Sequence, residues 1–189
     1  AIHSGLAMVL TLMIPLRKLF KYEDIITIEV LQNVAKTIVL TGLIVGLAYG
    51  TEYFIAWYSH NTIEMEQFRW RALGDYRWGF YFMVLCNTLI PLLFVFKKVR
   101  TTIATLFIIS LIVNFGMWWE RFVIIVGGVA HGFAPHAWGL YTPTLIEFGI
   151  MLGAFCLFFF LFVLFARHLP SVSMTEMKET LAEGAGHVA

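Results

Sequence analysis

Charged side chains inside long apolar runs are the residues of this sequence most able to do chemistry. Glu120 and Arg121 are adjacent in one run, Glu52 lies near the end of another, and Glu147 opens a third. An ionised group at the centre of a bilayer costs at least about 2.5 to 3.5 kcal/mol, so it marks a polar cavity or a functional path by default. We therefore take Glu120, Arg121 and Glu52 as candidate site residues.

Three further residues could belong to the same site. Asn114, Trp118 and Arg121 are spaced i, i+4 and i+7, which places them on one stripe of a helix. Such a stripe would line a cavity with an amide, an indole and a permanent cation, a set suited to a polar headgroup. His3 lies in the first apolar run and is also a candidate. By the orientation argued below, we expect all of these residues in the outer half of the membrane.

Structural roles are the alternative for the same charges. Glu120 and Arg121 point about 100° apart on a helix, so they could form ion pairs with different neighbouring helices. Glu147 could be an N-terminal charge that the helix dipole favours.

The composition requires a membrane to position these groups. Hydrophobic residues make up 60% of the 189 residues and charged residues only 13%, and the mean hydropathy is +0.81. A water-soluble domain carries about a quarter charged residues, so the soluble classes are excluded. Continuous apolar runs at residues 38–45 and 152–165 exclude the alternating pattern of a membrane barrel. The sequence predicts an all-α, polytopic transmembrane helix bundle.

About five spans are expected, of which the first is partial. We place them at Ala1 to Leu16, Val34 to Tyr58, Trp78 to Phe96, Thr102 to Val126 and Thr144 to Ala166. Residues 1–169 then form one transmembrane domain and residues 170–189 a tail. Most Lys and Arg residues fall on the side that includes this tail, which the positive-inside rule makes cytoplasmic. The N-terminal end of the chain is then periplasmic, and the loops Ser59 to Arg77 and Gly127 to Pro143 are outside.

Small residues and prolines predict how the spans pack. Gly42, Gly46 and Gly50 recur every four residues, which predicts a stripe where a neighbouring backbone approaches closely. We expect Pro91 to be compensated near the inner end of its helix, without a functional role. We also expect no broken helix near the middle of the membrane.

No metal or haem site is predicted in this chain. Cys86 and Cys156 have no paired spacing, and only His3 among the histidines could lie in a span, too few for the axial ligands of a membrane cytochrome. No phosphate-binding loop, dinucleotide fingerprint or zinc-protease motif occurs, and no nucleic-acid partner is expected.

Three stretches of the sequence resemble the NrfD or PsrC family of quinone-interacting membrane subunits. They are AIHSGLAMVLTLMIPLR at residues 1–17, FKKVRTT at 96–102 and NFGMWWERFVIIV at 114–126. The tail RHLPSVSMTEMK at residues 167–178 is similar too. More narrowly, the chain resembles the C subunits of bacterial alternative complex III. The resemblance covers essentially the whole chain, and its most specific part is GMWWERF.

The resemblance implies a subunit of a respiratory quinol:electron-acceptor oxidoreductase in the bacterial inner membrane. Menaquinol or ubiquinol, with menaquinone the favoured species, would pass electrons to a periplasmic iron–sulfur subunit and multihaem c-type cytochromes beside other membrane subunits. Proton translocation could accompany this transfer. The family subunit itself binds no haem or metal. Because family members have about ten transmembrane helices, we expect this chain to be the C-terminal half and inactive alone.

The resemblance also assigns roles to the candidate residues. Arg121, with Glu120, is carried over to the quinol pocket or its proton exit. A quinol site suits a fixed cation near carboxylates, so Arg121 would position quinol, Glu120 and Glu52 would accept or relay protons, and Asn114, Trp118 and His3 would line the site. Two alternatives stay open: half of an ion or proton transporter, and a purely structural anchor for outer subunits.

Overall fold

The fold is known from a computed structural model of the chain, which describes residues 1–23, 25–130, 139 and 141–168. The chain divides into two compact units, residues 1–140 and 141–189. Within these described residues, five helical stretches are long and apolar enough to cross a membrane. The predicted all-α, polytopic membrane fold is therefore confirmed.

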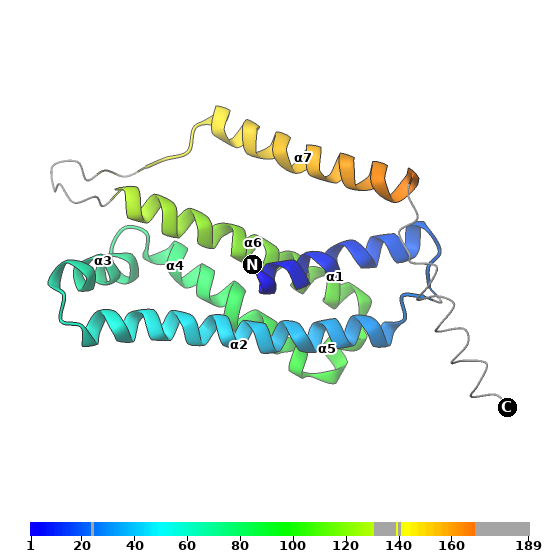
Figure 1. The fold of residues 1–189 in the computed structure, drawn as a ribbon, viewed down its shortest axis with the longest axis horizontal. Coiled ribbons are helices and arrows are strands. Elements are labelled where there is room, and N and C mark those ends of the chain that lie inside the picture. The colour runs from blue at the N-terminus through cyan, green and yellow to red at the C-terminus, as the bar shows by residue number, and fades with distance from the viewer. Residues whose placement is uncertain (24, 131–138, 140, 169–189) are drawn as a thin grey trace. The chain divides into compact units, whose positions relative to one another are not determined.

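The described residues of the first unit contain four of these stretches and two short helices, arranged as Figure 1 shows. Its elements in order are α1 (Ile2–Leu19), α2 (Ile28–Tyr58), α3 (Thr62–Leu73), α4 (Arg77–Val84), the π-helical turn η1 (Leu85–Leu89), the 3-10 segment η2 (Ile90–Val95), α5 (Lys97–Thr101) and α6 (Ile103–Ala130).

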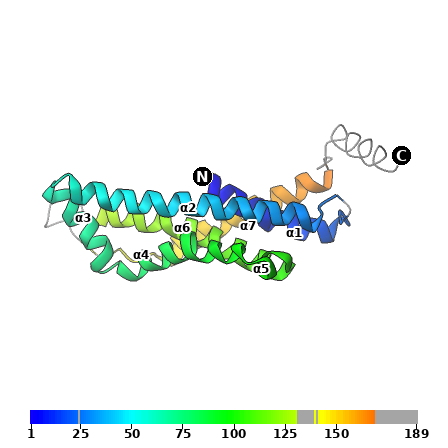
Figure 2. The ribbon, with the colours of Figure 1, turned by 90° about the horizontal axis from the view of Figure 1, so that it is seen from below.

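The helices of the first unit lie side by side along one direction (Figure 1). We call the end with α3 the α3 end, and the opposite end, where α2 begins and α5 lies, the α5 end. The stretch from α4 to α5 runs along one side of α2 and α6 (Figure 2). α1 is shorter than its neighbours and covers only the half of α2 toward the α5 end (Figure 1).

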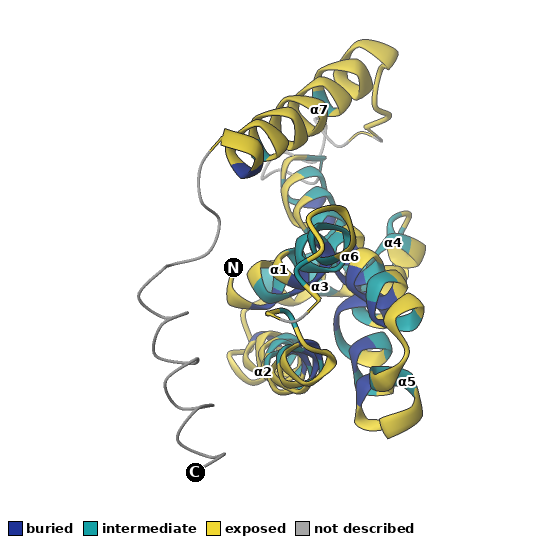
Figure 3. Cartoon of the chain, turned by 90° about the vertical axis from the view of Figure 1, so that its right-hand side faces the viewer, coloured by how far each residue is buried: buried dark blue, intermediate teal, exposed yellow. Residues whose placement is uncertain are grey.

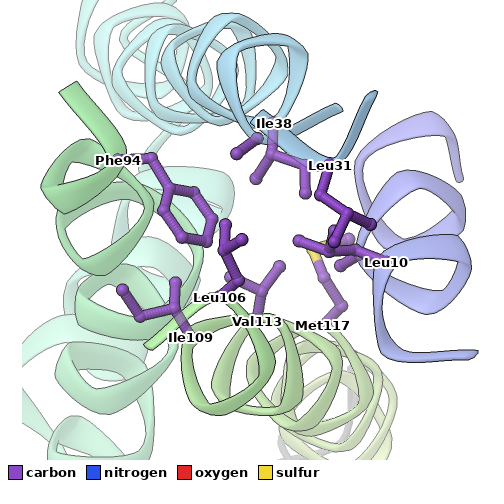
Figure 4. Packing of buried hydrophobic residues seen from close by; sticks show 10 residues of the cluster. Leu10, Leu31, Ile38, Phe94, Leu106, Ile109, Val113 and Met117 are labelled. Atoms are coloured by element: carbon purple, nitrogen blue, oxygen red, sulfur yellow. The ribbon is translucent and has the colours of Figure 1, made fainter. Parts of the chain in front are cut away.

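Buried residues of the first unit gather between α1, α2, α6 and the stretch from α4 to α5 (Figure 3). The apolar cluster lies toward the α5 end, where side chains from four elements point toward one another (Figure 4). Its buried members are Ala7, Leu10, Leu31, Ala35, Ile38, Phe94, Leu106, Ile109, Val113 and Met117. Lipid tails are as apolar as these side chains, so close van der Waals contact stabilises the cluster here.

The observed spans differ from the predicted ones mainly at their ends. α2 begins six residues before Val34, because the hydroxyl of Thr27 accepts a hydrogen bond from the backbone N–H of Val30 (3.4 Å) and caps the helix. The predicted loop after α2 contains the helix α3, which begins at a similar cap: the Asn61 side chain accepts from the N–H of Ile63 (3.2 Å).

The second unit contains one described helix, α7 (Leu145–His168), and matches the predicted fifth span. Thr144 and Glu147 cap its N-terminus: Glu147 Oε2 accepts from the Thr144 N–H (2.7 Å) and hydroxyl (2.9 Å), and Thr144 Oγ1 accepts from the Glu147 N–H (3.4 Å). This arrangement is a capping box, so the structural interpretation of Glu147 is confirmed. The same carboxylate, by hydrogen bonding, raises the pKa of Tyr141.

Candidate functional site

Three polar side chains from three spans meet in a hydrogen-bonded triangle, Tyr49–Asn87–Glu120. The Tyr49 hydroxyl donates to Glu120 Oε2 at 2.8 Å. Asn87 Nδ2 donates to the same carboxylate oxygen at 3.1 Å and to the Tyr49 hydroxyl oxygen at 3.0 Å. Asn87 is fully buried, while Tyr49 and Glu120 are partly buried. A carboxylate oxygen thus receives two donors inside the bundle, where few other partners are available.

Asn87 reaches this position from an irregular segment of the third span. α4 gives way to the π-helical turn Leu85–Leu89 and then to the 3-10 segment Ile90–Val95. Pro91 lies at the start of the 3-10 segment and has no N–H, so it cannot donate to the carbonyl of Asn87 as an α-helix requires. π turns within α-helices are frequent at functional sites. The third span is therefore irregular where an even helix was expected, and the absence of a functional role for Pro91 stays a prediction.

Glycines on two helices make room for the irregular segment. A Cβ on Gly116 of α6 would collide with Asn87 Oδ1 and Cys86 Cβ. On α2, a Cβ on Gly42 would lie 3.4 Å from the Asn87 carbonyl oxygen, and one on Gly46 would lie 2.5 Å from Thr88 Cγ2. The predicted glycine stripe is confirmed for these two positions. A Cβ on Gly50 meets no described atom within 4 Å, so that member of the stripe does not pack here.

His3 lies next to this segment near the middle of α2. Its Nδ1 is 2.8 Å from Thr41 Oγ1, and the side chain is 2% exposed. A Cβ on Gly42 would lie 3.3 Å from His3 Cε1, on the same face where it approaches Asn87. His3 therefore faces the middle of the bundle rather than its outer half, because α1 begins beside the centre of α2 (Figure 1).

Asn114 takes part in a second polar contact, between α1 and α6. Its Nδ2 donates to Thr11 Oγ1 at 2.9 Å, and Thr11 Oγ1 is also 2.9 Å from Ser110 Oγ. Hydrogen bonds of this kind tie transmembrane helices together. The structure thus gives Asn114 a helix-packing contact and leaves its predicted role in lining a quinol cavity a prediction.

The remaining predicted site residues lie outside both polar contacts. Trp118 is partly buried and belongs to a ring cluster in which its centroid is 5.7 Å from that of Phe115 and 6.1 Å from that of Trp119. Arg121 and Glu52 are exposed in the first unit, and neither forms a hydrogen bond or ion pair with a described residue. The cavity predicted along the stripe Asn114, Trp118 and Arg121 therefore stays a prediction, as do the roles of Arg121 and Glu52.

Tyr49 and Asn87 were not predicted, because the sequence candidates were charged residues, His3 and the two residues that share a helix stripe with Arg121. Both are polar residues inside apolar runs, and Asn87 lies four residues before a proline, a combination that signals an irregular membrane helix. Within the described ranges, no group of three or more His, Cys, Asp or Glu side chains gathers in a way that could hold a metal ion. His131, His136 and Trp138 of the second predicted outer loop lie outside the described residues.

Comparison with known proteins identifies one family. Residues 1–132 match the family model described as polysulphide reductase, NrfD. The matched region covers more than two thirds of the 189 residues and contains the whole Tyr49–Asn87–Glu120 triangle. No curated protein matches the chain.

Proposed function

This chain belongs to the NrfD family, and on that premise we propose that it binds and oxidises quinol in a complex of the alternative complex III type. Membership of the family implies a membrane subunit that interacts with quinone within a redox complex. Family members partner with iron–sulfur and other redox subunits. The complex type, the direction of electron flow and the residues involved belong to the proposal.

The observation that supports the proposal is the Tyr49–Asn87–Glu120 triangle. Oxidation of a quinol breaks its O–H bonds, and two protons must leave as two electrons depart, so the site needs a proton acceptor. Glu120 is the only carboxylate among the described residues that accepts hydrogen bonds from two other spans. Two donors on one oxygen hold the carboxylate in a fixed orientation, which defines the position at which it can accept a proton.

Electrons and protons then follow separate routes. An iron–sulfur cluster on a partner subunit, with c-type haems beyond it, would accept the electrons. The protons pass to Glu120, with Glu52 as a further acceptor or relay nearer the α3 end. Arg121 follows Glu120 on α6 and supplies a permanent cation that positions the quinol oxygens. Menaquinol is the favoured species, and the α3 end is the periplasmic side in this proposal.

A second candidate function is favoured by the irregular third span. Half-broken helices near the middle of the membrane are typical of ion and proton transporters, where freed backbone groups line a polar path. The π turn at Leu85–Leu89 and the 3-10 segment after it fit that description in part. Ion or proton transport that continues without quinol would favour this candidate. A purely structural anchor would instead lose assembly, rather than turnover, after substitution of its charges.

The test is the substitution Glu120→Gln in the assembled membrane complex. Gln keeps the shape and both hydrogen-bonded neighbours but cannot accept a proton at this position. We expect quinol-dependent electron transfer to fall at least about tenfold, in keeping with the usual contribution of a general base. Subunit content and the redox spectra of the partner subunits should stay normal. Unchanged turnover in a fully assembled variant would remove Glu120 from the chemistry.

A further inference from the structure

The side-chain amide of Asn87 uses both of its N–H groups inside the triangle. Its side-chain oxygen, Oδ1, has no hydrogen-bond partner among the described residues. A primary amide has two donor hydrogens, and these go to the Tyr49 hydroxyl and to Glu120. The buried oxygen instead lies against Gly116 of α6, where any Cβ would collide with it. The amide is thus fixed on one side by two hydrogen bonds and on the other by the backbone of α6.

The π turn determines which way this amide faces. In a regular α-helix, each residue turns by about 100°, so one residue more or less would rotate Asn87 away from α2 and α6. The wider turn at Leu85–Leu89 absorbs one residue within the span. Pro91 keeps the segment irregular, because a regular helix would require the N–H that it lacks.

The contacts of Glu120 depend on this arrangement. Glu120 Oε2 accepts one hydrogen bond from Asn87 and one from the Tyr49 hydroxyl. Asn87 also donates to that hydroxyl and so holds it in place. Removal of Asn87 would therefore take away one donor and free the other to rotate. A Cβ at Gly116 would first meet Asn87 Oδ1 and Cys86 Cβ, so a change there would act on Glu120 by displacing the irregular segment that carries Asn87.

We propose that Asn87 is the positioning residue of the Glu120 carboxylate, held in place by the π turn and by the absence of a side chain at Gly116. The expected effect on turnover rests on the proposed function, whereas the orientation of Glu120 by Asn87 does not. This positioning explains why the buried Asn87 amide, the π turn followed by Pro91, and Gly116 of α6 all lie beside the Glu120 carboxylate. Asn87 acts through Glu120 and does not itself exchange protons.

The experiment compares Asn87→Leu, Gly116→Ala and a matched control, Gly50→Ala, in the intact complex. Leu keeps the branched shape of Asn and removes both donors, and Ala at position 116 displaces the amide together with the neighbouring Cys86 side chain. Ala at position 50 makes the same chemical change where a Cβ meets no described atom within 4 Å. The direct readout is the infrared band of the Glu120 carboxyl group, identified as the band lost in Glu120→Gln.

We expect the Glu120 band to shift in Asn87→Leu and Gly116→Ala and to stay in place in Gly50→Ala. Quinol-dependent kcat should fall about tenfold in the first two variants with KM unchanged, and the double variant should be no worse than the worse single one. An unshifted band in an assembled Asn87→Leu or Gly116→Ala complex would overturn the inference. A shifted band with normal turnover would support Asn87 as the positioning residue and overturn the catalytic role of Glu120.

Discussion

Replacement of Tyr49 by Phe removes one hydroxyl from the triangle and leaves the ring in place. The hydroxyl donates to Glu120 Oε2 at 2.8 Å and accepts from Asn87 Nδ2 at 3.0 Å. A hydrogen bond to a charged group contributes about 1.5 to 3 kcal/mol, and about 1.4 kcal/mol corresponds to a tenfold change in rate. Asn87 still donates to the same oxygen in the variant, so we expect the lower end of this range, about a tenfold loss of turnover.

The assay is quinol-driven reduction of the electron acceptor by the purified complex, with subunit content measured on the same sample. Tyr53→Phe is the matched control, because Tyr53 lies one turn along α2 and its hydroxyl makes only a long bond to the Phe68 carbonyl oxygen (3.4 Å). The turnover of the control variant should fall by less than about twofold, since such a long hydrogen bond contributes little. Equal losses in the two variants, or none in Tyr49→Phe, would refute the reasoning.

The remaining predictions concern helix ends, helix contacts and orientation. Thr144→Ala should destabilise the start of α7 by about 1 kcal/mol through loss of its capping box, measured by hydrogen exchange at the first turn. Thr11→Val should weaken the contact of α1 with α6 by about 0.6 to 2 kcal/mol, measured by denaturation in detergent, with little change in quinol turnover. A cysteine introduced at Asn61 should react with an impermeant external reagent while one at Lys98 stays protected, and the reverse pattern would invert the proposed orientation.

The sequence predicts the spans well because each long apolar run has one stable arrangement in a bilayer. Predicted and observed limits of the third span agree within one residue, Trp78 to Phe96 against Arg77 to Val95. The ends of the helices were predicted less accurately, since the cap at Thr27 extends α2 through polar residues that a hydropathy pattern assigns to a loop.

The site was predicted only in part because its members come from different helices. Glu120 was found from its charge, but its partners Tyr49 and Asn87 lie 71 and 33 residues away. Their meeting depends on how α2, α6 and the third span rotate against one another, which the spacing along one helix does not reveal. Asn114 shows the same limit: its stripe with Arg121 is correct as helical geometry, yet its amide bonds to α1.

The most direct test of the account is an electron cryomicroscopy map of the assembled complex with quinone bound. We expect a quinone head group beside Glu120 and Arg121, with one of its oxygens within about 3 Å of one of these side chains. We also expect an iron–sulfur cluster on the subunit that covers the α3 end. Quinone density confined to a different part of the complex, with Arg121 paired to a carboxylate of a neighbouring helix, would contradict it.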